Sequence, residues 1–293
     1  MLEALAIQVV GGLSRGMVMF IVAAGLTLIF GALRIANFAH GAIYMLGAYL
    51  AFSVSSQLGF GTAAFVAALI LAPIGVGALG YALDQGLLRR IAHRSHYYQI
   101  ILTYAVALIV ADLVKMVWGV AYHSTPRPPI LDGALFLGAV VVPYYNLFLI
   151  VVGLLTLLAI HVMVNRTQFG MLLRASVMDS EMLGALGTDV RRLQTQVFVL
   201  GCMLAGLGGA LSAPTGSVSL GMDHAVIIES FAVVLIGGVG SIAGALVGAL
   251  IVGLGQAIGI LVAPEFSSAF IYIILALVMI FRHNGLFGGR LTP

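Results

Sequence analysis

Residues 165–196 read NRTQFGMLLRASVMDSEMLGALGTDVRRLQTQ and form the one long polar stretch in a chain of otherwise apolar segments. The stretch carries four arginines and three acidic residues, whereas the segments on either side are apolar enough to cross a lipid bilayer. It is also rich in residues that favour helices. This contrast predicts an all-α membrane protein that holds one charged, helix-forming loop on one face of the membrane, where the loop can bind a soluble partner.

The composition supports the same fold class. The chain has 293 residues, of which 62% are hydrophobic and 8% charged, whereas soluble domains are roughly a quarter charged. We therefore predict a single domain over residues 1–293, a polytopic transmembrane helix bundle with about eight or nine membrane segments. Several segments are short or contain glycines, which is typical of broken or re-entrant helices. The candidate spans are 16–33, 41–56, 61–83, 97–117, 145–164, 197–213, 225–239, 242–262 and 267–281.

The arginines predict how the bundle is oriented. Nine crossings place only Arg15 and Arg127 on one side of the membrane, and all the other arginines on the opposite side. Because positive charge accumulates in cytoplasmic loops, we expect the arginine-rich side to be cytoplasmic, the N-terminus to lie outside and the C-terminus to lie in the cytoplasm. The arginines on the expected cytoplasmic side are Arg34, Arg89, Arg90, Arg94, Arg166, Arg174, Arg191, Arg192, Arg282 and Arg290.

Sequence signatures of enzymes are absent. Lys115 is the only lysine, so the chain has no glycine-rich phosphate loop ending in lysine. The chain also has no HExxH, CxxC or GxSxG motif, and the one histidine pair with metal-ligand spacing, His93 and His96, lies beside three arginines that would oppose a cation. We therefore expect a protein that catalyses no reaction, holds no cofactor or metal and binds no nucleic acid.

Within the polar stretch, a short helix is predicted to begin near Met178 and to end at Gly187. Asp179 and Glu181 fall in its first turn, where negative charge interacts favourably with the helix dipole. An ordinary connecting loop with a surface helix is the plainer interpretation. The length of the stretch and its mixture of charge with apolar residues favour a docking helix on the cytoplasmic face. The apolar residues that we expect to be exposed on it are Met182, Leu183 and Leu186.

Ionisable residues also occur inside the candidate spans. Asp112 and Lys115 are three residues apart and can neutralise each other on one face of a helix. Glu229 has no basic residue near it in the sequence and lies close to the expected external mouth. Two interpretations of Glu229 stay open, a contact with a transported solute and a buried, hydrogen-bonded acid.

Two short motifs interrupt the apolar spans. Asn37 and His40 lie in ANFAHG, which suits a helix terminus at the membrane edge. They either line a translocation path or form a plain turn. The sequence GGVGSIAG at residues 237–244 is too rich in glycine for a stable helix interior and predicts a break between half-helices or a tight hairpin. Both a solute path and close helix packing are consistent with it.

Three stretches of the chain resemble the permease subunits of branched-chain amino acid ABC importers. They cover residues 25–52, 174–211 and 229–253. The first contains NFAHG at 37–41, the third contains GGVGS at 237–241, and the second has the Glu181-to-Gly187 spacing of the importers' E-x5-G coupling motif. Two features depart from the family: Ala42 stands where many relatives carry an acid, and RHNGLFG at 282–288 lacks the family's proline.

The resemblance implies a set of partners. These are two cytoplasmic ATPase subunits that use the ATP, a second permease subunit that is either a homologue or another copy of this chain, and a periplasmic binding protein. The complex would lie in the lipid bilayer of a bacterial inner membrane and import branched-chain or related amino acids. The alternative is an ion-coupled secondary transporter of a small polar solute, with Glu229 or Asp112 as the ion site.

The residue patterns and the resemblance together predict two groups of functional residues. The residues expected to couple the permease to the ATPases are Arg174, Asp179, Glu181, Met182, Leu183, Leu186 and Gly187. The residues expected along the translocation path are Asn37, His40, Gly41, Glu229, Gly237, Gly238, Gly240 and Ser241.

Overall fold

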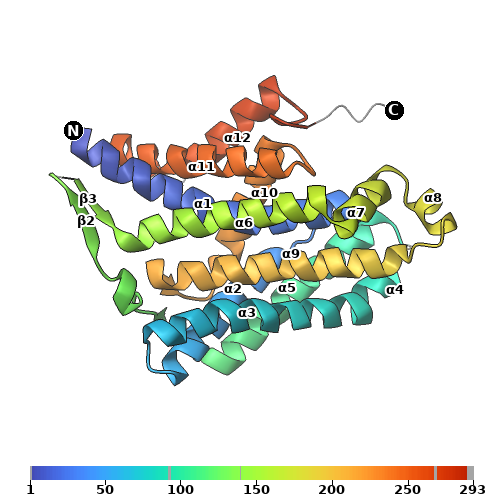
Figure 1. Cartoon of the computed structure of the whole chain (residues 1–293), viewed down its shortest axis with the longest axis horizontal. Helices are drawn as coiled ribbons and strands as arrows, with labels where there is room; N and C mark the ends of the chain where they lie inside the picture. Colours follow the sequence, from blue (N-terminus) through green and yellow to red (C-terminus); the bar gives the residue numbers. More distant parts are fainter. Residues whose placement is uncertain (1, 92–93, 139, 267–268, 289–293) are drawn as a thin grey trace.

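The computed structural model describes residues 2–91, 94–138, 140–266 and 269–288. Most of its long helices run along the longest axis of the molecule and form one bundle (Figure 1). The predicted helical bundle is confirmed. Its main helices are α1 (Leu2–Leu33), α2 (Ala39–Gln57), α3 (Thr62–Leu83), α5 (His96–Trp118), α6 (Tyr144–Arg166), α9 (Val190–Ser212), α10 (Met222–Gly237), α11 (Ile242–Val262) and α12 (Ala269–Phe281).

Within the described ranges, six helices are long and apolar enough to cross a membrane: α1, α3, α5, α6, α9 and α11. The protein is therefore a multi-pass membrane protein. Helix α12 is apolar but has 13 residues, and α10 has 16. Eight membrane segments would require two of α2, α10 and α12 to cross as well, and nine would require all three. Residues 267 and 268 of the last predicted span, and Arg290, lie outside the described residues.

Two small antiparallel sheets were not predicted. Strands β1 (His123–Ser124) and β4 (Ser217–Val218) pair with each other, and β2 (Ala134–Leu137) forms a hairpin with β3 (Val140–Pro143). The β2–β3 hairpin lies at one end of the bundle, whereas α7 (Gln168–Met178) and α8 (Ser180–Ala185) lie at the other end (Figure 1). The paired strands satisfy backbone groups within the connections between helices.

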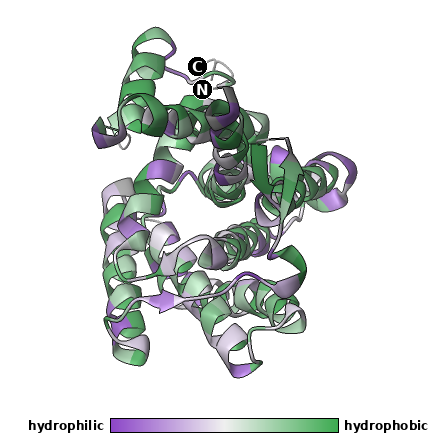
Figure 2. Cartoon of the chain, turned by 90° about the vertical axis from the view of Figure 1, so that its left-hand side faces the viewer, coloured by the Kyte–Doolittle hydropathy of each residue, from purple (hydrophilic) through white to green (hydrophobic). Residues whose placement is uncertain are grey.

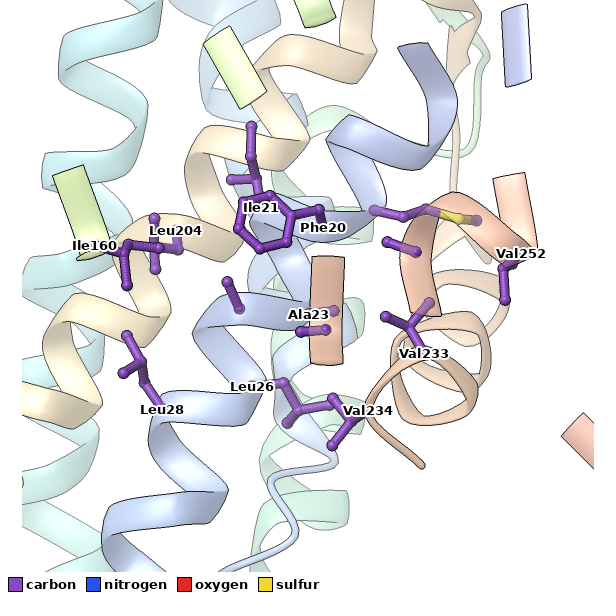
Figure 3. Packing of buried hydrophobic residues seen from close by; sticks show 14 of the residues in the cluster. Phe20, Ile21, Ala23, Leu26, Leu28, Ile160, Leu204, Val233, Val234 and Val252 are labelled. Carbon is purple, nitrogen blue, oxygen red and sulfur yellow. The ribbon is translucent and has the colours of Figure 1, made fainter. Parts of the chain in front are cut away.

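Helix α1 lies at the centre of the packing. Figure 3 shows its side chains, including Phe20 and Leu26, among residues of α6, α9, α10 and α11. Helices α5 and α6, in contrast, bury only a minority of their side chains. Apolar residues dominate the outside of the bundle when it is viewed from the end that carries β2 and β3 (Figure 2). Exposed apolar side chains on a membrane protein face lipid or another subunit.

Small residues allow the helix backbones to approach closely, as the glycine content predicts. A Cβ atom added to Gly253 of α11 would lie 2.5 Å from the carbonyl oxygen of Gly12 on α1. A Cβ atom added to Gly47 of α2 would lie 2.6 Å from the Cα of Gly206 on α9. Both distances are shorter than any real contact of a Cβ atom, so larger side chains would force these helices apart.

Two predicted boundaries were wrong. Helix α1 begins at Leu2 rather than near residue 16, because Arg15, which suggested a loop, is paired with an acid on another helix. Helix α9 begins at Val190 rather than near residue 197. The carboxylate of Asp189 accepts a hydrogen bond from the backbone N–H of Arg192 at 3.0 Å and so starts that helix early. The polar connection therefore lies between α6 and Val190 and is itself mostly helical.

Candidate coupling surface and solute cavities

Side-chain caps fix the path of the polar connection. Thr167 accepts from the backbone N–H of Gly170 at 3.2 Å and starts α7, and Asp179 accepts from Met182 N–H at 2.9 Å and starts α8. Gly187 follows α8 with a φ of +87°, a conformation that glycine adopts without strain. The predicted short helix before Gly187 is confirmed. Helix α7, which precedes it, was not predicted.

Helix α8 presents an apolar surface to its surroundings. Met182 is 60% exposed, Leu186 is 76% exposed, and Met178 just before the helix is 87% exposed. We call these three residues the coupling surface. Glu181 and Arg174 are also exposed. Leu183 was predicted to be exposed, but it is buried. Met182 and Leu186 share one face of the helix, whereas Leu183 lies about 100° further round and points toward the bundle.

Two arginines tie α7 to the bundle. The guanidinium of Arg174 donates to the carbonyl oxygen of Val164, near the end of α6. Arg34, which follows α1, donates to the carbonyl oxygen of Val177 in α7 at 3.4 Å. These two contacts join α7 to the ends of α1 and α6. That Arg174 takes part in coupling stays a prediction. Its hydrogen bond to Val164 holds α7 against the end of α6.

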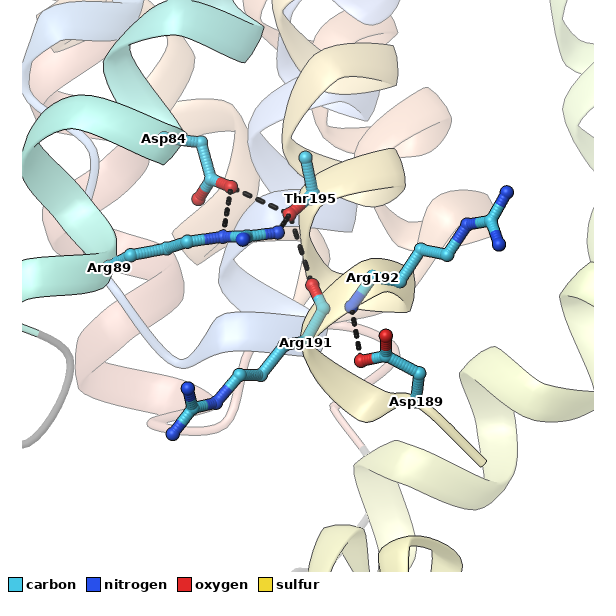
Figure 4. Close-up of polar contacts among 6 residues, drawn as sticks. All are labelled: Asp84, Arg89, Asp189, Arg191, Arg192 and Thr195. Carbon is cyan, nitrogen blue, oxygen red and sulfur yellow. Dashed lines mark hydrogen bonds and ion pairs between the residues drawn. The ribbon is translucent and has the colours of Figure 1, made fainter. Parts of the chain in front are cut away.

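A buried polar cluster beside these helices was missed in the sequence. Asp84 opens a π-helical turn (Asp84–Leu88) after α3, and Arg89 follows in α4 (Arg89–Ile91). The hydroxyl of Thr195 on α9 donates to Asp84 Oδ2 at 2.6 Å, and the Arg89 guanidinium lies 2.9 Å from Thr195 Oγ1 and 3.4 Å from Asp84 Oδ2 (Figure 4). The carboxylate and the hydroxyl are 111 residues apart, so no local pattern indicates that they meet.

We expect Asp84→Ala to destabilise the permease by about 2 kcal/mol, because the Arg89 guanidinium and the Thr195 hydroxyl lose the Asp84 carboxylate. Thr195 keeps the carbonyl oxygen of Arg191 as an acceptor at 3.0 Å. The Arg89 side chain is 39% exposed, so solvent screening limits its share of the loss. Asp84→Asn keeps an oxygen acceptor for Thr195 and should cost about 1 kcal/mol. Thermal unfolding of the purified protein in detergent measures both variants. Equal stability of Asp84→Ala and the unmodified chain would contradict a stabilising role for the cluster.

A cavity of about 530 Å³ connects this cluster to the coupling helices. Its lining includes Asp84 and Arg89 on one side, Ser180 and Glu181 at the start of α8, and Arg191 on α9. Glu181 therefore faces the space between the coupling surface and the buried cluster. Its position supports the prediction that Glu181 belongs to the coupling group.

Glu229 has a basic partner that the sequence did not indicate. Its Oε1 accepts from the Arg15 guanidinium at 3.1 Å and from the Gln256 side-chain amide at 3.2 Å. These three residues come from α10, α1 and α11. The pair of Arg15 and Glu229 lies between two cavities of about 410 Å³ and 240 Å³, and both residues line each of them. The larger cavity also has a polar lining that includes Tyr44, Asn146 and Ser212. Glu229 is thus both hydrogen-bonded and accessible to a solute.

Asn37 and His40 are fully buried at the start of α2. Asn37 Oδ1 accepts from the backbone N–H of Ala39 at 3.2 Å, and a ring nitrogen of His40 lies 2.9 Å from the carbonyl oxygen of Val22 on α1. The predicted helix terminus is confirmed. Val22 lines the larger cavity, so His40 lies behind its wall. Gly41 lies against the backbone of Asp223 on α10, where any side chain would overlap.

The sequence GGVGS forms a tight turn between α10 and α11, as predicted. Gly238 and Gly240 have φ values of +100° and +80°, and Ser241 caps α11 by accepting from the N–H of Gly244 at 3.0 Å. The tail after α12 pairs with this turn: the N–H of Leu286 donates to the carbonyl oxygen of Ile236 at 2.8 Å. The turn and Val177 of α7 line one cavity. The turn therefore lies at the end of the bundle that carries α7, away from Glu229. The residues predicted along the translocation path thus do not form one group.

Asp112 and Lys115 were predicted to neutralise each other. Both are exposed on α5, and no ion pair joins these two described side chains. Both groups point out of the bundle rather than toward each other. A charged residue on an apolar helix requires water, lipid headgroups or another protein chain.

A family model described as "Branched-chain amino acid transport system / permease component" matches residues 8–279. The chain belongs to this family. The match extends from α1 to α12 and includes the coupling helices and the cavities around Glu229.

Curated members of the permease family are similar along nearly the whole chain. The branched-chain amino acid permease BraD of Pseudomonas aeruginosa is 27% identical, over 96% of this chain and 95% of its own length. The permease LivH of Escherichia coli is 24% identical, over 96% and 94%. The probable permease LivH of Methanocaldococcus jannaschii is 27% identical, over 89% and 82%. Membership of a permease family agrees with a chain that transports rather than catalyses, and it does not favour the ion-coupled alternative.

Proposed function

We propose that this chain is the transmembrane permease of an ATP-driven importer and translocates branched-chain or related amino acids delivered by a periplasmic binding protein. The observation that carries the proposal is the coupling surface. Three apolar side chains are exposed at one end of a permease whose sequence has no phosphate-binding loop. A transporter that uses ATP through a separate subunit needs such a surface.

Two cytoplasmic ATPase subunits would bind the coupling surfaces of two permease chains. Their movement on ATP binding would displace α8 and α7. The contacts of Arg34 and Arg174 then carry the displacement to α1 and α6. The cluster of Asp84, Arg89 and Thr195 joins α9 to the segment after α3 in the same region. The bundle would thereby alternate between outward and inward access. ATP is used by the partner, and the permease holds no cofactor.

The second permease chain, a homologue or another copy, would pack against α5. Support comes from Asp112 and Lys115, which are exposed on an otherwise apolar helix. Contact with a second chain or with a hydrated path between two chains would avoid the cost of facing lipid, which is roughly 3 kcal/mol for a charged residue at the membrane centre. The binding protein would deliver the amino acid at the opposite end of the bundle from α8.

We further propose a bacterial inner-membrane location with nine crossings, an external N-terminus and a cytoplasmic C-terminus. The whole of 1–293 would then act as one permease domain. The arginine distribution supports this orientation, and it places α7 and α8 in the cytoplasm beside the ATPases. Arg15 and the cavities around Glu229 would lie toward the outer side.

Uptake into proteoliposomes tests the proposed function. The complete importer should accumulate leucine delivered by its binding protein when ATP is enclosed, and an ionophore that removes ion gradients should leave this uptake intact. Replacing ATP by a non-hydrolysable analogue should stop it. Uptake that depends on an ion gradient and continues without ATP hydrolysis would contradict the proposal and support a secondary transporter.

A further inference from the structure

We propose that the smaller cavity beside Glu229 binds the amino and carboxylate groups of an aliphatic amino acid during translocation. The proposal rests on the proposed function for its class of solute. The site lies between α1, α10, α11 and α12, and its volume is about 240 Å³. This volume exceeds the roughly 30 Å³ share of a single water molecule several-fold. It therefore suits a small metabolite.

An unpartnered buried group points to a ligand. Gln256 is 6% exposed, and its amide nitrogen donates to Glu229 Oε1 at 3.2 Å. This bond fixes the orientation of the amide, so its oxygen points away from the carboxylate. That oxygen, Gln256 Oε1, is buried and has no hydrogen-bond partner among the described residues. A buried acceptor without a donor is costly, and an ammonium group of a ligand would supply the missing donor.

The charges in the site match both ends of a zwitterion. Arg15 uses one of its N–H groups on Glu229 Oε1, and its side chain is 52% exposed. Its remaining N–H groups are available to a carboxylate, which arginine binds well. The second oxygen of Glu229 is available to an ammonium group, and Gln256 Oε1, which is enclosed in this structure, would become its second acceptor if the amide turned toward the cavity. Because Arg15 and Glu229 cancel each other's charge, a zwitterion leaves the site neutral, whereas a simple amine or acid does not.

The rest of the lining is apolar and predicts the nature of the side chain. Ile260 lies one helical turn after Gln256 on α11, Ala225 lies one turn before Glu229 on α10, and Ile271 comes from α12. Tyr272 borders the same cavity. An aliphatic side chain next to these residues would bury apolar surface while the polar groups of the ligand remain paired.

Direct binding to the detergent-purified importer without its binding protein tests the site. Three probes separate the contributions of the amino group and the carboxylate to binding. They are leucine, 3-methylbutylamine, which lacks the carboxylate, and 4-methylpentanoate, which lacks the amino group. We expect the unmodified complex to bind leucine at least tenfold more tightly than either analogue. Gln256→Met, which has a similar size and no acceptor, should weaken leucine binding about tenfold and leave 4-methylpentanoate unaffected. Arg15→Gln should remove the preference for leucine over 3-methylbutylamine.

Gln57→Met, at the exposed end of α2, is the matched control and should bind all three probes as the unmodified complex does. A purely structural ion pair would change thermal stability in the variants but not the ratio of affinities. Unaltered ratios in Arg15→Gln, a variant at a half-exposed position, would overturn the proposal even if Gln256→Met does not assemble. ATP-driven uptake by the unmodified complex tests the proposed function separately, so failure of the site and failure of the function give different results.

Discussion

Replacing Met182 and Leu186 together by aspartate is expected to reduce ATP-driven uptake at least tenfold and to abolish co-purification of the ATPase subunits. Both side chains project from α8 with exposures of 60% and 76%, so the change leaves the core of the permease intact. Where an apolar side chain is one of the few central hot spots of a protein interface, its loss costs roughly 2 kcal/mol or more. Two buried carboxylates would add a desolvation cost. Uptake into proteoliposomes and affinity purification of the complex measure the two effects.

Leu58→Asp is the matched control for this experiment. Leu58 is 59% exposed in the turn between α2 and α3, at the opposite end of the bundle from α8 (Figure 1). It introduces one of the two negative charges at a similar exposure but away from the expected ATPase contact. Normal binding of the ATPases by the Met182 and Leu186 variant would refute the coupling surface. Equal loss in the control would indicate that the charge itself, rather than its position, disturbs the complex.

Local sequence patterns predicted the turns and helix ends that are determined by residues close together in the chain. The GGVGS turn needs positive φ at Gly238 and Gly240, and glycine supplies it regardless of the rest of the fold. Asp179 and Gly187 mark the two ends of α8 through local interactions as well. Asp179 accepts a hydrogen bond from an N–H in the first turn, and Gly187 follows the helix in a left-handed conformation. The start of α1 was missed because Arg15 was placed in a connection outside the membrane, whereas it lies within the helix and its partner is 214 residues further along the chain.

The functional sites were harder to predict, because their polar groups meet only after the helices pack. Glu229 was identified as a possible solute contact, but Arg15 and Gln256 were not associated with it. Asp84 was overlooked because it is a single acid after an apolar helix, and Thr195 because it is one of several polar residues in the first turns of α9. Leu183 was assigned to the exposed surface because a short helix was treated without the protein on which it packs. In each case the deciding information is a distance between helices, which a single sequence does not contain.

Gly209→Ala is expected to destabilise the permease by about 3 kcal/mol, toward the upper end of the cost of overpacking. The new Cβ atom would overlap the carbonyl oxygen of Tyr44 and lie 2.8 Å from the backbone nitrogen of Ala48. Both atoms belong to the backbone of α2, so no side-chain rotation relieves the overlap. The two helices must separate, and the loss extends to the contact between Gly47 and Gly206 on the same pair of helices.

Gly86→Ala makes the same chemical change in the π-helical turn and has no atom within 4 Å of the new Cβ. It should leave stability unchanged or raise it by about 0.5 kcal/mol, because alanine restricts the unfolded chain more than glycine does. Thermal unfolding of both variants in one detergent separates the two effects, since only Gly209→Ala should lower the midpoint. If both variants unfolded at the same temperature, the close approach of α2 and α9 would not be what requires glycine at position 209. A large loss confined to Gly209→Ala would instead show that backbone contact between helices, rather than apolar composition alone, holds this bundle together.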